Sequence, residues 1–175
     1  MIISVTDARK YISTMDDDSV LEAKLQALEQ SIRQYTNNNF QQRGYRIGAD
    51  IISGELFAGG WLPFKAGDTI QISASVFNNG LYTVAAVTSE KITLKESIID
   101  EEDVIVTKVV YPSDVVMGVL NMLKWDMENR AKVGIQSETI SRHSVTYFNM
   151  DGENSVMGYP KSLLGFLTPY KKARF

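Results

Sequence analysis

The spacing of apolar residues changes twice along this chain. Between residues 19 and 36, large apolar residues recur at alternating steps of four and three, which is one stripe of an amphipathic α-helix. The stripe consists of Leu21, Leu25, Leu28, Ile32 and Tyr35. From Gly44 to Tyr111, runs such as TIQIS and KITLK lie between Gly-rich turns, which is typical of strands joined by tight connections. Helical spacing returns after Pro112, so the chain combines helices with a small sheet.

Capping signals place the ends of the helices. Ser19 and Glu22 have the spacing of a capping box, and the three aspartates before them suit the positive end of a helix. Thr6 fits the N-cap of a short first helix, and Pro112 fits the first turn of the last one. We therefore expect helices near residues 6–13, 19–37 and 112–131.

Helical segments that flank a β segment imply that the chain leaves and re-enters one helical core at neighbouring points. We expect an α+β fold in which a helical bundle core is interrupted by a small antiparallel β-barrel-like insertion and followed by an extended C-terminal arm. The acidic run at residues 100–103 is expected to be a solvated loop. The predicted boundaries are residues 1–44 and 109–157 for the helical core, 45–108 for the inserted β domain and 158–175 for the arm.

The last predicted helix is apolar on more than one stripe. A helix wetted on one side needs fewer apolar residues. Either the helix is central in its own bundle, or it presents a second face to another subunit, and the sequence leaves both readings open. The candidate subunit-interface residues are Val115, Val119 and Met122.

The composition argues against most catalytic chemistry. Without cysteine, the chain has no disulfide, thiolate nucleophile or thiol-ligated metal. Its one histidine, His143, has no companion in a catalytic or metal-binding pattern, and no phosphate-binding glycine motif occurs. We expect a protein without enzymatic activity, cofactor or metal. No apolar run approaches the ~18 residues of a membrane span, and no leader is visible, so we also expect a soluble protein.

Two features have both a functional and a structural interpretation. The aspartates at 16–18 could bind a cation, but they lack the spaced ligands of a calcium loop, and helix capping is the better interpretation. Trp61, beside Pro63 and Phe64, could be a ligand platform. An aromatic residue near a Gly-rich turn more often closes the end of a small barrel, and we favour that reading.

The C-terminal sequence GYPKSLLGFLTPYKKARF carries four basic side chains and no acidic one, although the net charge of the chain is −3. Its large apolar residues either dock on the protein's own core or bind a partner, and both can hold for different residues. The candidate partner-binding residues are Pro160, Leu163, Leu164, Phe166, Leu167, Tyr170, Lys171, Lys172, Arg174 and Phe175.

The order of these segments resembles a known family. The segments VTDARKYI, DDDSVLEAKLQALEQSIRQYTNNNF, VVYPSDVVMGVLNMLKWDMENR, SETISRHSVTYF and YPKSLLGFLTPYKKARF look like the head-tail connector, or head-completion, proteins of long-tailed bacteriophages. The resemblance covers residues 1–44 and 109–175. The β insertion departs from the minimal all-helical pattern of that family.

The resemblance implies a structural protein of the virion neck that assembles in the host cytoplasm. It implies a ring, expected to contain twelve copies, that binds the portal after DNA packaging and extends the DNA channel toward a head-closure or tail-side protein. The C-terminal segment would reach the portal, and DNA would pass through the ring without specific binding.

Two other functions remain as alternatives. One is a nucleic-acid-binding module that uses the basic, aromatic tail, although a sequence pI of about 5.2 and the lack of other basic patches weaken it. The other is a ligand-binding β domain on a helical scaffold.

Overall fold

The computed structural model describes residues 1–133, 137–140, 143–146 and 153–173. The chain divides into two compact units. The barrel unit consists of Met1–Ile2 and Asn38–Tyr111, and the helical unit consists of Ile3–Asn37 and Pro112–Phe175. Each unit is described by itself.

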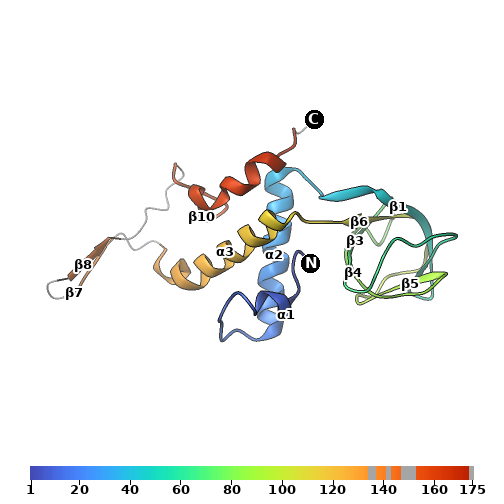
Figure 1. Cartoon of the computed structure of the whole chain (residues 1–175), viewed down its shortest axis with the longest axis horizontal. Helices are drawn as coiled ribbons and strands as arrows, with labels where there is room; N and C mark the ends of the chain where they lie inside the picture. Colours follow the sequence, from blue (N-terminus) through green and yellow to red (C-terminus); the bar gives the residue numbers. More distant parts are fainter. Residues whose placement is uncertain (134–136, 141–142, 147–152, 174–175) are drawn as a thin grey trace. The chain divides into compact units, whose positions relative to one another are not determined.

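The barrel unit is a closed antiparallel barrel (Figure 1). Its strands are β1 (Gln41–Ile52), β2 (Glu55–Phe57), β3 (Thr69–Ser73), β4 (Gly80–Val87), β5 (Lys91–Leu94) and β6 (Glu101–Val109). They follow one another around the barrel in the order β1-β2-β5-β4-β3-β6, and β6 pairs back onto β1. Closure leaves no free sheet edge for pairing with another chain.

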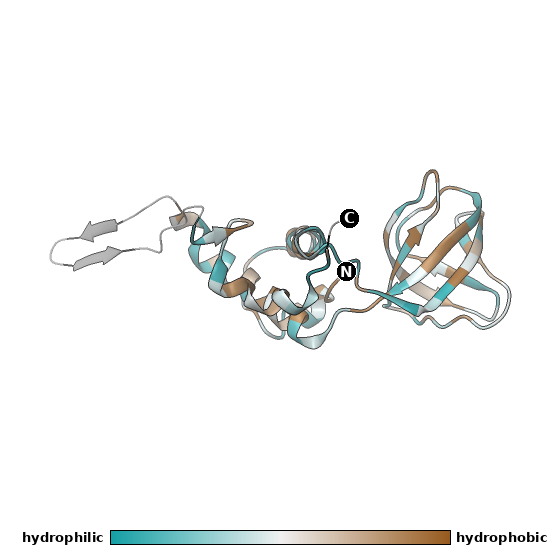
Figure 2. Ribbon diagram, turned by 90° about the horizontal axis from the view of Figure 1, so that it is seen from above, coloured by the Kyte–Doolittle hydropathy of each residue, from teal (hydrophilic) through white to brown (hydrophobic). Residues whose placement is uncertain are grey.

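Alternation along the strands builds the core of the barrel (Figure 2). In β3, for example, Ile70 and Ile72 are fully buried, whereas Gln71 between them is partly exposed. This is the period of two that places alternate residues on opposite faces of a sheet. The fully buried core residues also include Leu56, Val84, Ile92, Val104 and Val106.

The β1–β2 hairpin depends on two residues in the left-handed region. Ile52 pairs with Glu55, so the connection is only Ser53 and Gly54, with φ values of 53° and 74°. Two successive positive φ values are the geometry of the type I′ turn that matches the twist of a hairpin. Glycine takes this conformation without the steric cost that a β-carbon adds.

The loop between β3 and β4 is folded around the carboxylate of Glu101. Ser75 Oγ donates a hydrogen bond of 2.5 Å to Glu101 Oε2, and Asn78 Nδ2 donates one of 2.9 Å to the same oxygen. The backbone N–H of Val76 donates to Oε1. This loop reverses the usual distribution of side chains. The polar side chain of Asn78 is buried, whereas the apolar side chains of Val76 and Phe77 are exposed.

The helical unit consists of helices and short hairpins. The helices are α1 (Val5–Ala8), α2 (Asp18–Thr36), α3 (Ser113–Asn129), η1 (Arg130–Lys132) and η2 (Lys161–Tyr170), of which η1 and η2 are 3₁₀-helices. Strand β7 (Ser137–Ile140) pairs with β8 (His143–Thr146), and β9 (Ser155–Val156) pairs with β10 (Tyr159–Pro160). The buried apolar residues of α2 face those of α3 and η2, which contact it.

The caps differ from the sequence prediction. Ser4, not Thr6, caps α1, since Ser4 Oγ accepts a hydrogen bond of 3.1 Å from the Asp7 N–H. Helix α2 begins at Asp18 after the N-cap Asp17, so the predicted capping box at Ser19 is wrong. The predicted end of this helix near residue 37 is confirmed: Asn37 is the C-cap, with a φ of 49° in the left-handed region.

The predicted helical-bundle core is wrong. The best-developed structure in the described residues is the closed barrel, and an α+β class fits only in part. The sequence reading missed β1, although Tyr45, Ile47, Ala49 and Ile51 alternate in it with more exposed residues. Gly44 and Gly48 interrupt this pattern, and glycine is uncommon in strands. The sequence reading also called residues 100–103 a loop, whereas β6 begins at Glu101 with its charges in solvent.

The predicted extended arm is also wrong over most of its described length. Residues Lys161–Tyr170 form the 3₁₀-helix η2, and two of its leucines are buried. Apolar spacing in such a short segment does not distinguish an extended arm from a helix packed on its own unit.

Candidate partner-binding surface

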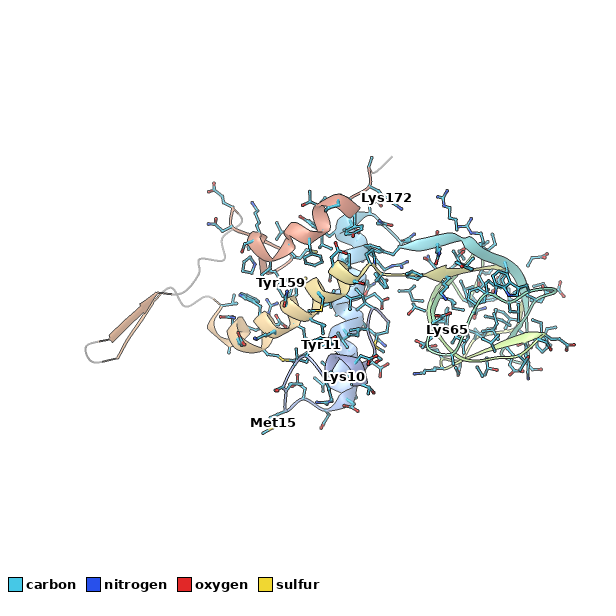
Figure 3. The ribbon with its side chains drawn as sticks, viewed as in Figure 1. Lys10, Tyr11, Met15, Lys65, Tyr159 and Lys172 are labelled. Atoms are coloured by element: carbon cyan, nitrogen blue, oxygen red, sulfur yellow. The ribbon has the colours of Figure 1, made fainter. Side chains whose placement is uncertain are left out.

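The C-terminal segment, defined here as residues 158–173, packs on the helical unit. Helix η2 contacts both α2 and α3 (Figure 3). Leu164 and Leu167 are buried in this contact, with 4% and 0% of their surface exposed. The leucines of the segment therefore contribute to the core of the helical unit.

Phe166 occupies a notch that exists only because α3 has a glycine at position 118. A β-carbon added at Gly118 would lie 2.3 Å from the Phe166 ring, which is far inside any real contact distance. The ring thus packs directly on the backbone of α3. Glycine costs about 1 kcal/mol relative to alanine inside a helix, so its presence here is explained by this close approach.

Polar contacts fix the end of η2 to α3 and α2. The Tyr170 hydroxyl donates to Asp114 Oδ1 at 2.8 Å, and this hydrogen bond raises the pKa of Tyr170 above its usual value. Lys171 Nζ donates to the Tyr35 hydroxyl at 2.7 Å and lies 4.0 Å from the centre of the same ring. The cation therefore gains a hydrogen bond and a cation–π contact.

Backbone atoms continue this attachment beyond η2. The Lys172 N–H donates to the Thr36 carbonyl at 2.8 Å. The Asn37 side chain donates to the Ala173 carbonyl at 2.7 Å. The C-terminal carbonyl groups of α2 and its cap residue thus hold the chain as far as Ala173.

A cation–aromatic cluster holds the start of the segment. The Arg130 guanidinium lies 5.5 Å from the centre of the Trp125 ring and 5.0 Å from that of Tyr159. It also donates to the Gly158 carbonyl at 3.1 Å and to Asp126 at 2.6 Å. Burial, and next the negative charge of Asp126, raise the pKa of Tyr159.

The conformation of η2 is unusual for its length. It runs for 10 residues and includes Pro169. The turns of a 3₁₀-helix have poorer hydrogen-bond geometry than those of an α-helix, and 3₁₀-helices longer than three or four residues are uncommon. Side-chain contacts with α2 and α3 therefore carry much of the stability of this helix.

The predicted partner-binding residues fall into groups with different surroundings. Pro160, Leu164 and Leu167 are buried, whereas Lys171 and Lys172 are exposed. Leu163, Phe166 and Tyr170 are partly exposed. Arg174 and Phe175 lie outside the described residues.

The predicted subunit-interface residues are inside the helical unit. Val115, Val119 and Met122 each have 0% of their surface exposed. In this conformation they offer no surface to a second copy, although Met117 of the same helix is 44% exposed. These three residues are therefore buried within the protein's own helical unit.

Trp61 does not close the end of the barrel, because 74% of its surface is exposed. Phe64, three residues later, is buried in the barrel core instead. The favoured reading of Trp61 is therefore wrong, and its side chain is free to contact a ligand.

The aspartates at 16–18 are explained by the start of α2. The aspartates form ion pairs at the start of α2: Asp16 pairs with Lys24, and Asp18 pairs with Arg9. His143 belongs to β8, and the position of its side chain is not among the described features. Across the described part of the chain, no group of three histidine or acidic side chains is placed to hold a metal ion.

Sequence reasoning missed Gly118, Asp114 and Arg130 as residues that hold the C-terminal segment. The glycine had a signal, since an isolated glycine in a helical pattern often marks a close packing contact. Asp114 and Arg130 gave no such signal in the sequence, because an acid in a first helical turn and a basic residue near a helix end are explained by the helix dipole alone.

No family model matches the chain, and no curated protein matches its sequence. Within the described residues, no helix is both long enough and apolar enough to span a bilayer.

Proposed function

We propose that this chain is a structural adaptor of a phage neck, which forms a ring between the portal and tail-side proteins and extends the DNA channel. The resemblance of its outer segments to head-completion proteins suggests this function. The observation that carries the proposal is a C-terminal segment with no acidic residue, held on α2 and α3 as a long 3₁₀-helix.

Such a segment suits exchange between two binding places. In the isolated chain, the leucines of the C-terminal segment pack on the protein's own helical unit, while Lys161 and Lys172 are exposed. On the portal, the apolar side chains would enter clefts between portal subunits and the cations would face acidic groups. The backbone hydrogen bonds of a 3₁₀-helix are weaker than those of an α-helix. Releasing this segment from its own unit therefore costs less free energy than releasing an α-helix would.

A ring overcomes the entropic cost of transferring each C-terminal segment to the portal. After the first segment binds, the segments of the other copies act at a high effective concentration. The expected partners are the portal, a head-closure or tail-side protein, and other copies of this chain, with twelve copies in the virion ring. DNA would pass through without specific binding, in keeping with the net charge of −3.

Charge reversal at the exposed end of the segment tests this function. Lys172→Glu should weaken binding to the portal of the same phage, because the attraction to acidic groups of the portal becomes a repulsion. The expected loss is about tenfold in affinity, which corresponds to about 1.4 kcal/mol. Biolayer interferometry at several salt concentrations would measure this effect. Lys124→Glu, which reverses an exposed cation of α3, is the matched control. Equal portal affinity of both variants and the wild type would contradict the proposal.

Opening the glycine notch provides a second test. Gly118→Ala should expel the Phe166 ring, so amide exchange over residues 161–170 should accelerate while portal binding is kept or strengthened. Gly165→Ala is the control, because a β-carbon there meets nothing within 4 Å. Loss of portal binding by a folded Gly118→Ala variant would show that the docked conformation, and not the released one, is the active one.

A further inference from the structure

The barrel unit has an open groove of about 730 Å³ that the proposed function does not use. The residues that line it include Tyr45, Trp61, Phe64, Lys65, Asp68 and Lys108. Lys65 lies on the surface of the barrel (Figure 3). The volume of the groove is in the range of small-ligand sites, which are commonly 300–1,000 Å³.

One wall of the groove is an aromatic corner. The Trp61 and Tyr45 rings have centroids 6.1 Å apart and planes inclined at 51°. Trp61 is 74% exposed, although Phe64 anchors the same loop in the barrel core. An indole ring left in water on an anchored loop offers a flat apolar face to a ligand.

The groove also contains a carboxylate with unused hydrogen-bonding capacity. Only 9% of the Asp68 side chain is exposed. Its Oδ2 accepts hydrogen bonds from the Lys65 N–H at 2.9 Å and from Lys108 Nζ at 2.6 Å. Its Oδ1 accepts none from the part of the chain that the structure describes. Asp68 Oδ1 is not one of the buried unpaired atoms of the described residues, so water reaches it and a ligand hydroxyl can donate to it in place of water.

The combination identifies the chemical class of the ligand. A pyranose ring has a flat face of C–H groups and an edge of hydroxyl donors, which match the Trp61 ring and Asp68 Oδ1. A nucleic-acid strand would also stack on Trp61, but Lys108, one of the two lysines of the groove, is already paired with Asp68 at 2.6 Å and is not free for a phosphate. We propose that the barrel groove binds a carbohydrate chain of pyranose sugars, with one sugar stacked on Trp61 and hydroxyl groups bound by Asp68. This inference does not depend on the proposed adaptor function.

Nuclear magnetic resonance of the full chain tests the proposal with defined probes. The ligands are cellohexaose, chitohexaose and β-1,4-mannohexaose, each titrated to about 10 mM, which detects millimolar affinities. The chain has two tryptophans, Trp61 and Trp125, so the Trp125 indole signal is an internal control. We expect the Trp61 indole N–H and the Asp68 amide to shift saturably with at least one sugar, while Trp125 does not shift.

Substitutions then locate the binding. Trp61→Ala should weaken the affinity of that sugar, followed by calorimetry, at least about tenfold, and Asp68→Asn should also weaken it. Phe77→Ser replaces another exposed aromatic residue of the barrel unit, outside the groove, and should bind as the wild type does. Absence of a saturable Trp61 shift with all three sugars, or unchanged binding by Trp61→Ala, would overturn the proposal. A shift with a thymidine oligonucleotide but with no sugar would overturn it in favour of nucleic acid.

Discussion

Glu101 is a single residue that orders a whole loop of the barrel. Its carboxylate accepts hydrogen bonds from side chains and backbone of residues 75–78, and these bonds lower its pKa below the usual 4.5, with Ser75 as the largest cause. The neighbouring exposed apolar pair, Val76 and Phe77, is thereby held in a fixed conformation. The ionised form of Glu101 is therefore part of the loop structure.

The lowered pKa gives a pH dependence with a definite sign. A carboxyl group whose pKa is depressed on folding stabilises the folded state above its unfolded pKa, and this contribution is lost as pH falls through the folded value. We expect amide exchange at Val76 and Phe77, corrected for its intrinsic pH dependence, to become less protected below about pH 4.5. Glu101→Gln should show low protection already at neutral pH, as measured by amide exchange. Equal protection in the variant and the wild type at neutral pH would show that the loop does not need the charge.

At the scale of elements, the C-terminal end of α3 determines where the C-terminal segment begins. Arg130 lies against the rings of Trp125 and Tyr159 and donates to the Gly158 carbonyl. The planar guanidinium can stack on rings and donate in several directions at once, which an ammonium group cannot do. This cluster therefore joins α3 to β10 without an extensive apolar contact.

Replacement of the guanidinium should loosen this junction. Arg130→Lys should lower the free energy of unfolding of the helical unit by about 1 kcal/mol, the size of a cation–π contact at a partly exposed site. It should also accelerate amide exchange at Tyr159 and Lys161. Lys124→Ala on the same helix is the control, and urea unfolding followed by circular dichroism is the measurement. A loss of stability equal to that of the control would show that the cluster contributes nothing.

The elements also show what the sequence could and could not predict. The apolar stripe of α2 and the run TIQIS of β3 coincide with their observed elements to within a residue or two, because their burial follows the local period. Strand β1 was missed although its burial alternates, because Gly44 and Gly48 obscure that alternation in the sequence. The sequence left the docking of η2 open. Gly118 signals a close packing contact, but its partner Phe166 is distant in sequence and could not be identified.

At the scale of the whole molecule, each unit has a core of its own. The barrel core contains only residues between Ala49 and Val106. In the helical unit, the buried side chains of α2 and α3 lie outside that range. Two separate cores predict two unfolding events, because cooperativity depends on shared packing.

Core truncations should separate these events. Leu25→Ala in α2 and Ile72→Ala in β3 each remove a fully buried side chain and should cost about 2–5 kcal/mol in their own unit. Calorimetry with unit-resolved amide exchange should show that each variant lowers the stability of one unit and leaves the other unchanged. Equal loss of protection in both units for either variant would show that the chain unfolds as one body.

The pairing of the first and last strands has a consequence for how this protein can be engineered. Gln41 lies opposite Val109, and the Val110 N–H donates to the Phe40 carbonyl at 3.0 Å, so the strands of the barrel begin and end at neighbouring points. A fluorescent reporter or an affinity tag with equally close termini can replace the segment from β1 to β6 there, with loss of the hydrogen bonds between Met1 and Thr69.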